Sequence, residues 1–134
     1  MARKKEASPR PSNSELKVLE LLWEADAPLY AREVTKHAAQ RYGWNKNTTY
    51  TLLGSLVEKG CVRREDPDFL CVPLKDRRQV QASEARDLMD RLFDGSPEML
   101  LSAFFEEEGV SDQELQKLRR LVEDYRRGDG PQKK

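Results

Sequence analysis

Residues 44–60 have the sequence Trp-Asn-Lys-Asn-Thr-Thr-Tyr-Thr-Leu-Leu-Gly-Ser-Leu-Val-Glu-Lys-Gly. Its leucines and valine recur at the spacing of a helix with one buried stripe, and Gly60 is a suitable C-cap. The opposite face carries hydrogen-bonding, nearly uncharged side chains: Lys46, Thr48, Tyr50, Thr51 and Ser55. Exposed helix faces normally carry Glu, Lys and Arg, which favour the helix more than Thr and Tyr do. We therefore expect this face to have a partner other than water.

Two helices are predicted before this stretch. Ser12 and Glu15 form a capping box at the start of the first helix, which ends near residue 25. The second runs from about residue 31 to residue 42 and is closed by Gly43. Buried positions at helical spacing are Leu16, Leu19, Leu22 and Trp23 in the first helix, and Val34 and Ala38 in the second. Trp23 and Trp44 are expected to anchor the core, and His37 is either packed there or at the surface.

After Gly60 the pattern changes from helical to extended. Residues 61–65 and 69–73 are β-prone runs separated by Asp66-Pro67-Asp68, which predicts a hairpin whose second strand ends at proline. Three helices followed by a hairpin form a winged helix-turn-helix domain, here residues 12–75. In that arrangement the third helix is presented to the DNA major groove, and the hairpin is the wing beside it. Arg63 and Arg64 are then either phosphate contacts or solvated strand residues.

The chain from residue 76 to residue 127 is predicted to be a three-helix dimerisation domain. Ser96 with Pro97 starts its second helix, and Ser111 with Glu114 caps its third. The second helix is apolar almost all round, so we expect burial on several sides, supplied by a second copy. The residues predicted to form this homodimer contact are Leu88, Leu92, Leu100, Leu101, Phe104, Phe105, Leu115, Leu118, Val122 and Tyr125. The predicted fold class is therefore mainly α with a small β-hairpin.

Composition sets limits on the remaining classes. The 134 residues are 37% hydrophobic and 36% charged, with no apolar run near the roughly 18 residues of a membrane span and no signal-peptide core, so a cytoplasmic protein without membrane insertion is expected. Residues 1–75 carry 13 Lys and Arg against 10 Asp and Glu, and the rest carry 11 against 14. This excess is too small to indicate nucleic acid by itself. A disordered basic arm at residues 1–11 and a disordered tail at residues 128–134 are expected.

Metal and enzyme chemistry find little support. Cys61 and Cys71 form neither Cys-x-Cys nor Cys-x-x-Cys; if Glu65 faces Phe69, Arg63 faces Cys71 and the two thiols are diagonal neighbours about 7–8 Å apart. We expect two apolar fillers, no metal and no cofactor. A phosphate loop, a His-Glu-x-x-His motif and a nucleophile elbow are all absent from the sequence. A protein-interaction module that reuses a winged helix without binding DNA stays open as the alternative.

The order of these motifs resembles the penicillinase and methicillin-resistance repressor family. The resemblance covers about residues 12–127, and it rests on the Thr-x-x-Thr-Leu-Leu-x-x-Leu-x-x-Lys-Gly pattern from Thr48 and on Leu92-Phe-Asp-Gly-Ser-Pro97. It implies a homodimeric winged-helix repressor that binds a palindromic double-stranded operator of antibiotic-resistance or cell-envelope-stress genes. It also implies inactivation by proteolysis, triggered by a partner membrane metalloprotease system.

Carried over by position, the family's groove-facing residues fall on Lys46, Thr48, Tyr50 and Thr51. The family's scissile Asn-Phe bond aligns with Ala103-Phe104, so Phe is kept and Asn is replaced. Family members usually have Arg where Ser55 stands and an aromatic residue where Cys71 stands.

Overall fold

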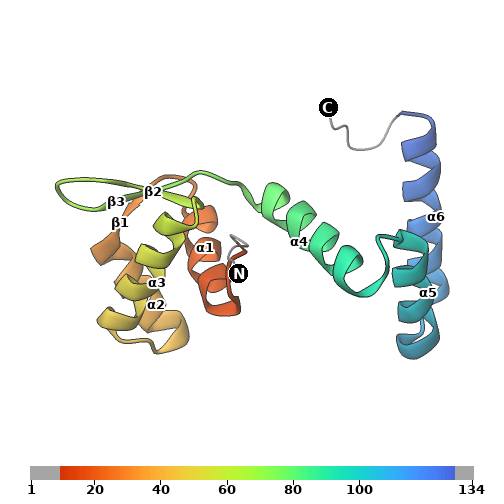
Figure 1. Ribbon diagram of the computed structural model, residues 1–134, viewed down its shortest axis with the longest axis horizontal. Helices are drawn as coiled ribbons and strands as arrows, with labels where there is room; N and C mark the ends of the chain where they lie inside the picture. Colours follow the sequence, from red (N-terminus) through yellow and green to blue (C-terminus); the bar gives the residue numbers. More distant parts are fainter. Residues whose placement is uncertain (1–9, 129–134) are drawn as a thin grey trace, which may run out of the picture. The chain divides into compact units, whose positions relative to one another are not determined.

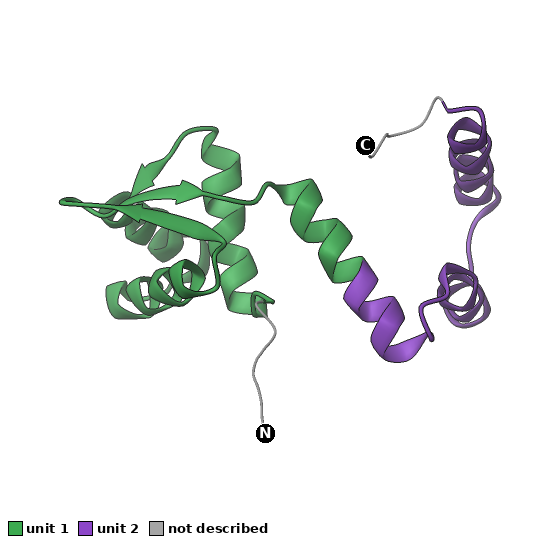
Figure 2. Cartoon of the chain, turned by 45° about the horizontal axis from the view of Figure 1, so that its top comes forward, with its two compact units in different colours: residues 1–85 green, residues 86–134 purple. Residues whose placement is uncertain are grey.

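The structure, a computed structural model, describes residues 10–128, so most of the predicted arm and tail lies outside the described residues. Its elements are α1 (Asn13–Ala25), β1 (Leu29–Tyr30), α2 (Ala31–Tyr42), α3 (Lys46–Glu58), β2 (Val62–Glu65), β3 (Leu70–Pro73), α4 (Arg77–Leu92), α5 (Pro97–Glu108) and α6 (Asp112–Arg126), as Figure 1 shows. The predicted class, mainly helical with a winged helix and a helical C-terminal part, is confirmed. The chain divides into two compact units, residues 1–85 and 86–134 (Figure 2), whereas the sequence analysis placed the boundary at the start of α4.

The start of α1 is the predicted capping box. The Ser12 backbone N–H donates to Glu15 Oε1 at 2.8 Å, and the Glu15 N–H donates to Ser12 Oγ at 3.1 Å. These two bonds satisfy backbone donors that the first helical turn leaves without partners. Helix α2 is held in a similar way, because Glu33 accepts the Tyr30 N–H at 2.8 Å. His37 is exposed on α2, so it lies at the surface, which is one of the two positions that the sequence allowed.

The core of the first unit lies where α1, α2 and α3 meet the sheet. Its fully buried members come from all three helices and from the strands: Val18, Leu19, Leu22, Val34, Leu53, Leu56, Val62 and Cys71. Trp23 and Trp44 pack against this cluster, as predicted. Burial of these leucines and valines fixes which side of α3 faces inward, and it therefore leaves the Thr-rich side of α3 at the surface.

The sheet has the order β1-β3-β2, and β1 was not predicted. Strand β1 pairs antiparallel with β3, placing Leu29 opposite Cys71, and the Ala31 N–H extends the pairing to the Phe69 carbonyl at 2.9 Å. A strand of two residues has no alternation for sequence analysis to detect. It forms because β3 offers it an otherwise unpaired edge.

The expected hairpin register is wrong by one residue. Arg64, not Arg63, lies opposite Cys71, and Glu65 lies opposite Leu70. The cause is Phe69, which has φ 57°, a left-handed conformation that belongs to the turn and not to a strand. A one-residue shift exchanges the two faces of a strand, so the side chains expected beside Cys71 change with it.

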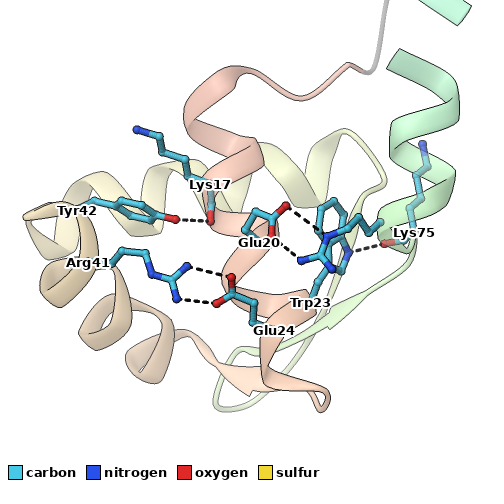
Figure 3. A network of polar contacts seen from close by, with 8 residues as sticks. Lys17, Glu20, Trp23, Glu24, Arg41, Tyr42 and Lys75 are labelled. Atoms are coloured by element: carbon cyan, nitrogen blue, oxygen red, sulfur yellow. Dashed lines mark hydrogen bonds and ion pairs between the residues drawn. The ribbon is translucent and has the colours of Figure 1, made fainter. Parts of the chain in front are cut away.

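The first two turns of α4 belong to the first unit. Val80 is buried there, and Arg77 donates to both oxygens of Glu20, at 2.5 and 3.4 Å. Figure 3 shows the neighbouring bond from Trp23 Nε1 to the Lys75 carbonyl, 2.9 Å long. Arg10, at the end of the predicted arm, donates to both oxygens of Glu84. The first half of α4 is thus held in the first unit by the Arg77–Glu20 pair to α1 and by the bond from Arg10, which precedes α1, to Glu84.

The second unit has capped helices and no buried side chain among its described residues. Ser96 Oγ accepts the Met99 N–H, and Ser111 Oγ accepts the Glu114 N–H, each at 3.1 Å, so both predicted helix starts are confirmed. Neither α5 nor α6 has a buried residue. The burial expected around α5 is therefore not supplied by residues 10–128 of a single chain. Within residues 10–128, every helix is too short or too polar to cross a lipid bilayer.

Candidate nucleic-acid interface

The exposed face of α3 begins at a well-formed N-cap. Asn45 Oδ1 accepts the Thr48 N–H at 2.8 Å, which fixes the first turn. Residues of that turn and the next line a shallow, open depression of about 310 Å³: Asn45, Asn47, Thr48, Thr51 and Leu52. The surface combines amides, hydroxyls and one apolar side chain at the end of a helix, which are the groups that read base edges in a major groove.

The structure brings the predicted α3 residues onto this surface with one qualification. Lys46, Thr48 and Thr51 are exposed. Tyr50 is half-buried, and its ring lies 5.9 Å from the ring of Phe69 with an interplanar angle of 58°. Tyr50 therefore also packs α3 against the end of the hairpin turn, a role that the sequence did not predict for it.

Thr49 differs in burial from the exposed Thr48 beside it. It is fully buried, and its Oγ1 has no hydrogen-bond partner among the described residues. Burial of an unpaired hydroxyl is unfavourable. The Thr48-Thr49 pair thus divides between the outer surface and the core, as adjacent helical residues at the edge of a buried stripe do.

Both wing arginines are engaged by carboxylates. Arg63 Nε and Nη2 donate to Glu65 Oε2 at 3.0 and 2.6 Å, and Arg64 Nε donates to Asp66 Oδ1 at 2.8 Å. The Arg64 guanidinium also lies 4.0 Å from the centre of the Phe69 ring. From the sequence, Arg63 and Arg64 could be either phosphate contacts or solvated strand residues. The structure shows a third arrangement, in which each charge is paired within the wing.

Helix α2 presents cations that the sequence analysis did not assign to the interface. Arg32 and Lys36 are exposed, four residues apart on one side of α2, and no ion pair joins either to an acid among the described residues. Arg32 lies 4.6 Å from the centre of the Tyr30 ring. Arg41 differs from them, because it donates to both oxygens of Glu24, at 3.2 and 2.6 Å (Figure 3). The sequence feature that could have identified Arg32 and Lys36 is the i, i+4 spacing of two basic residues on the polar side of α2.

The two thiols are apolar fillers, as expected. Cys61 and Cys71 are both buried and free. Burial raises the pKa of Cys61, and burial raises the pKa of Cys71 to about 11. Among residues 10–128 there is no group of three or more His, Cys, Asp and Glu placed to hold a metal ion.

The predicted dimer residues divide by exposure. Leu88, Leu100, Phe105 and Leu118 are half-buried. The others are exposed, namely Leu92, Leu101, Phe104, Leu115, Val122 and Tyr125. The Ala103-Phe104 bond lies in the middle of α5, with Ala103 half-buried and Phe104 50% exposed.

Comparison with known proteins gives a consistent result. The family model for the penicillinase repressor matches residues 11–124. The penicillinase repressor of Bacillus licheniformis is 23% identical over 120 residues, which cover 88% of this chain and 93% of that protein. The methicillin resistance regulatory protein MecI of Staphylococcus aureus (strain N315) is 21% identical over 113 residues, 83% of this chain and 91% of that protein. Since the match extends from before α1 into α6, the chain belongs to the penicillinase repressor family.

Proposed function

We propose that the protein is a transcriptional repressor that binds a two-fold symmetric DNA operator as a homodimer. The observation that carries this proposal is the exposed face of α3, where Lys46, Thr48 and Thr51 are free to meet a partner. Short hydroxyl side chains allow the helix backbone to approach base edges closely, and a hydroxyl both donates and accepts hydrogen bonds. Membership of a repressor family supports the same function.

Tyr50 is the fourth residue that we assign to the operator contact. Its ring is held by Phe69, so the position of its hydroxyl on α3 is restrained before DNA arrives. Restraint of this kind lowers the entropy lost on binding. We assign Tyr50 and Thr51 to base recognition and Lys46 to the phosphate backbone beside them.

The dimer is supported by the apolar surface of the second unit. Large side chains of α5 and α6 are about half exposed in the single chain, among them Leu101, Phe104, Leu121, Val122 and Tyr125. Apolar surface of this extent is unfavourable in water and typical of an interface. A second copy would cover it, and the pair would place two recognition helices in successive major grooves about 34 Å apart.

Proteolysis between Ala103 and Phe104 would inactivate such a repressor. The cut would separate α6 and part of α5 from the DNA-binding unit. Because the bond lies inside a helix, α5 must unwind before a protease can bind it in the extended conformation. We assign the trigger to a membrane metalloprotease system and the regulated genes to antibiotic resistance or envelope stress. A repressor of this kind would act in the cytoplasm.

The test is a gel shift with the DNA upstream of the protein's own gene, run beside a duplex that carries one half-site. A homodimeric repressor binds the full site more tightly than the half-site, and its affinity falls as salt rises. Equal affinity for both duplexes would contradict the dimeric operator complex. Failure to bind any duplex would favour the protein-interaction module.

A further inference from the structure

We infer that, outside the α3 surface, the phosphate contacts of this protein come from α2 and not from its wing, because the wing neutralises its own arginines. The inference rests on the proposed function and deepens it by assigning the surface that holds the DNA backbone. It starts from the charges of residues 62–73. This segment contains Arg63 and Arg64 against Glu65, Asp66 and Asp68, so its net charge is −1.

The geometry of the wing shows how its acidic residues neutralise the two arginines. Arg63 places two of its nitrogens on a single oxygen of Glu65, and Arg64 places Nε on Asp66. All four of these side chains are at least about two-fifths exposed, so each pair is individually weak and a phosphate could displace the carboxylate. The displaced carboxylate would then remain beside the phosphate, because it lies only two residues further along the chain. Repulsion between these anions cancels the attraction that the arginine supplies.

Phe69 restrains the second arginine further. The Arg64 guanidinium lies 4.0 Å from the ring centre of Phe69, and that ring also packs on Tyr50. A cation held over an aromatic face is stabilised there by the ring quadrupole. Turning Arg64 towards a phosphate would remove both this contact and the Asp66 pair.

The cations of α2 have no competing carboxylate among residues 10–128, although the Arg32 guanidinium lies 4.6 Å from the centre of the Tyr30 ring. Arg32 and Lys36 are exposed, and among the described residues neither forms an ion pair with an acid. The nearest acid along the helix is Glu33, whose carboxylate accepts the Tyr30 N–H at the start of α2. In a helix-turn-helix, the helix before the recognition helix crosses the DNA backbone. Each unpaired cation there can displace condensed counterions, which is the source of salt-dependent affinity.

The experiment measures the salt dependence of binding to a random-sequence duplex and to the protein's own upstream DNA. Phosphate contacts do not depend on sequence, so the operator need not be known. For each lost contact the slope of log affinity against log salt should become shallower by about 0.9 per protomer. We expect this change for Lys36→Gln and for Arg32→Gln, and no change for Arg63→Gln. Lys117→Gln, which removes an exposed cation from α6, is the matched control.

A double-mutant cycle on the wing distinguishes two reasons why Arg63 would make no phosphate contact. Either Glu65 neutralises Arg63, or the wing lies too far from the DNA. Glu65→Gln should tighten binding and steepen the slope, because Arg63 is then free to contact a phosphate. Adding Arg63→Gln to Glu65→Gln should remove that gain, although Arg63→Gln alone leaves the salt slope unchanged. If Arg63→Gln alone makes the salt slope shallower by as much as Lys36→Gln does, the inference is wrong while the proposed function stands. A wild-type protein that binds neither duplex overturns both.

Discussion

Glu15 and Lys59 form an ion pair that joins the first turn of α1 to the C-cap of α3. Lys59 Nζ lies 2.7 Å from Glu15 Oε1 and also donates to the Arg10 carbonyl at 2.9 Å. Glu15 is only 4% exposed, which is unusual for a carboxylate. Burial raises the pKa of this carboxyl. Hydrogen bonds from Lys59, Ser55 and the Ser12 N–H, together with the Lys59 charge, lower the pKa by more than burial raises it, so the pKa lies below its ordinary value.

Glu15→Gln should lower the free energy of unfolding at neutral pH by about 2 kcal/mol, because a buried, charge-assisted hydrogen bond is weakened. Since the folded pKa of Glu15 lies below its unfolded value, this contribution is complete above the unfolded pKa. It is lost as the pH falls through the folded pKa. Denaturant unfolding of both proteins between neutral and acid pH measures it. The difference should shrink below about pH 4.5, the ordinary value. Glu24→Gln, which breaks the exposed pair with Arg41, should change stability little.

Thr49→Val should stabilise the protein by about 1 kcal/mol and leave DNA binding unchanged. The substitution keeps the shape of the side chain and removes the buried, unpaired hydroxyl. Thr48→Val is the matched variant one residue away, on the exposed face. It should leave stability nearly constant and weaken operator binding. Thermal melting and gel shifts on the two variants test this pair, and a destabilised Thr49→Val would show that the hydroxyl has a partner.

Tyr50→Phe and Tyr50→Ala should separate the two roles of Tyr50. The phenylalanine keeps the packing on Phe69, so it should lose only base recognition, about 1–3 kcal/mol of discrimination between operator and random DNA. The alanine should lose that discrimination and stability as well. Thr51→Ala, on the exposed face, should behave as Tyr50→Phe does. Equal losses on operator and random DNA would make Tyr50 a positioning residue.

Phe104→Ala should shift the protein towards monomer without altering the DNA surface. Truncation of a Phe that the partner buries typically costs about 3–5 kcal/mol, and in a homodimer the loss occurs on both chains. Analytical ultracentrifugation measures the mass, and a gel shift on full and half sites measures the lost avidity. Leu74→Ala removes a comparably exposed apolar side chain from the first unit, and it should stay dimeric. A dimeric Phe104→Ala that binds as wild type does would remove α5 from the interface.

Thiol-reactive reagents should label Cys61 and Cys71 slowly in the native protein and rapidly in denaturant. Both side chains are buried, and the pKa of Cys71, raised to about 11, keeps that thiol protonated at neutral pH. The labelling rate should follow opening of the winged helix, and Glu15→Gln should accelerate it. Rapid labelling of the native protein at neutral pH would contradict the burial of the sheet.

Helix starts were predictable because their signals are local. Ser12, Ser96 and Ser111 each bond a backbone N–H three residues on, as the sequence indicated. The buried face of α3 was equally predictable, because the helical spacing of its apolar residues lies within a single helix. The sequence also placed Thr48 on the polar face and left Thr49 out of it, and the structure exposes Thr48 and buries Thr49.

Features that depend on distant residues were not predictable. Strand β1 exists because β3 pairs with it, and the wing register follows from the left-handed Phe69. The wing pairs depend on side-chain direction within a twisted hairpin, so Arg63 and Arg64 appeared available from their sequence alone. Arg10 was assigned to a disordered arm, although it donates to Glu84 on α4, 74 residues away.

Because the described part of the second unit has no buried side chain, repression should depend on the concentration of the repressor. If a second copy covers α5 and α6, then at low abundance the amount of paired repressor falls with the square of the amount synthesised. A cell that slows translation or dilutes its proteins by growth would release its operators more steeply than it loses chains. Separated chains would also expose α5 to general proteases, so abundance and lifetime would fall together.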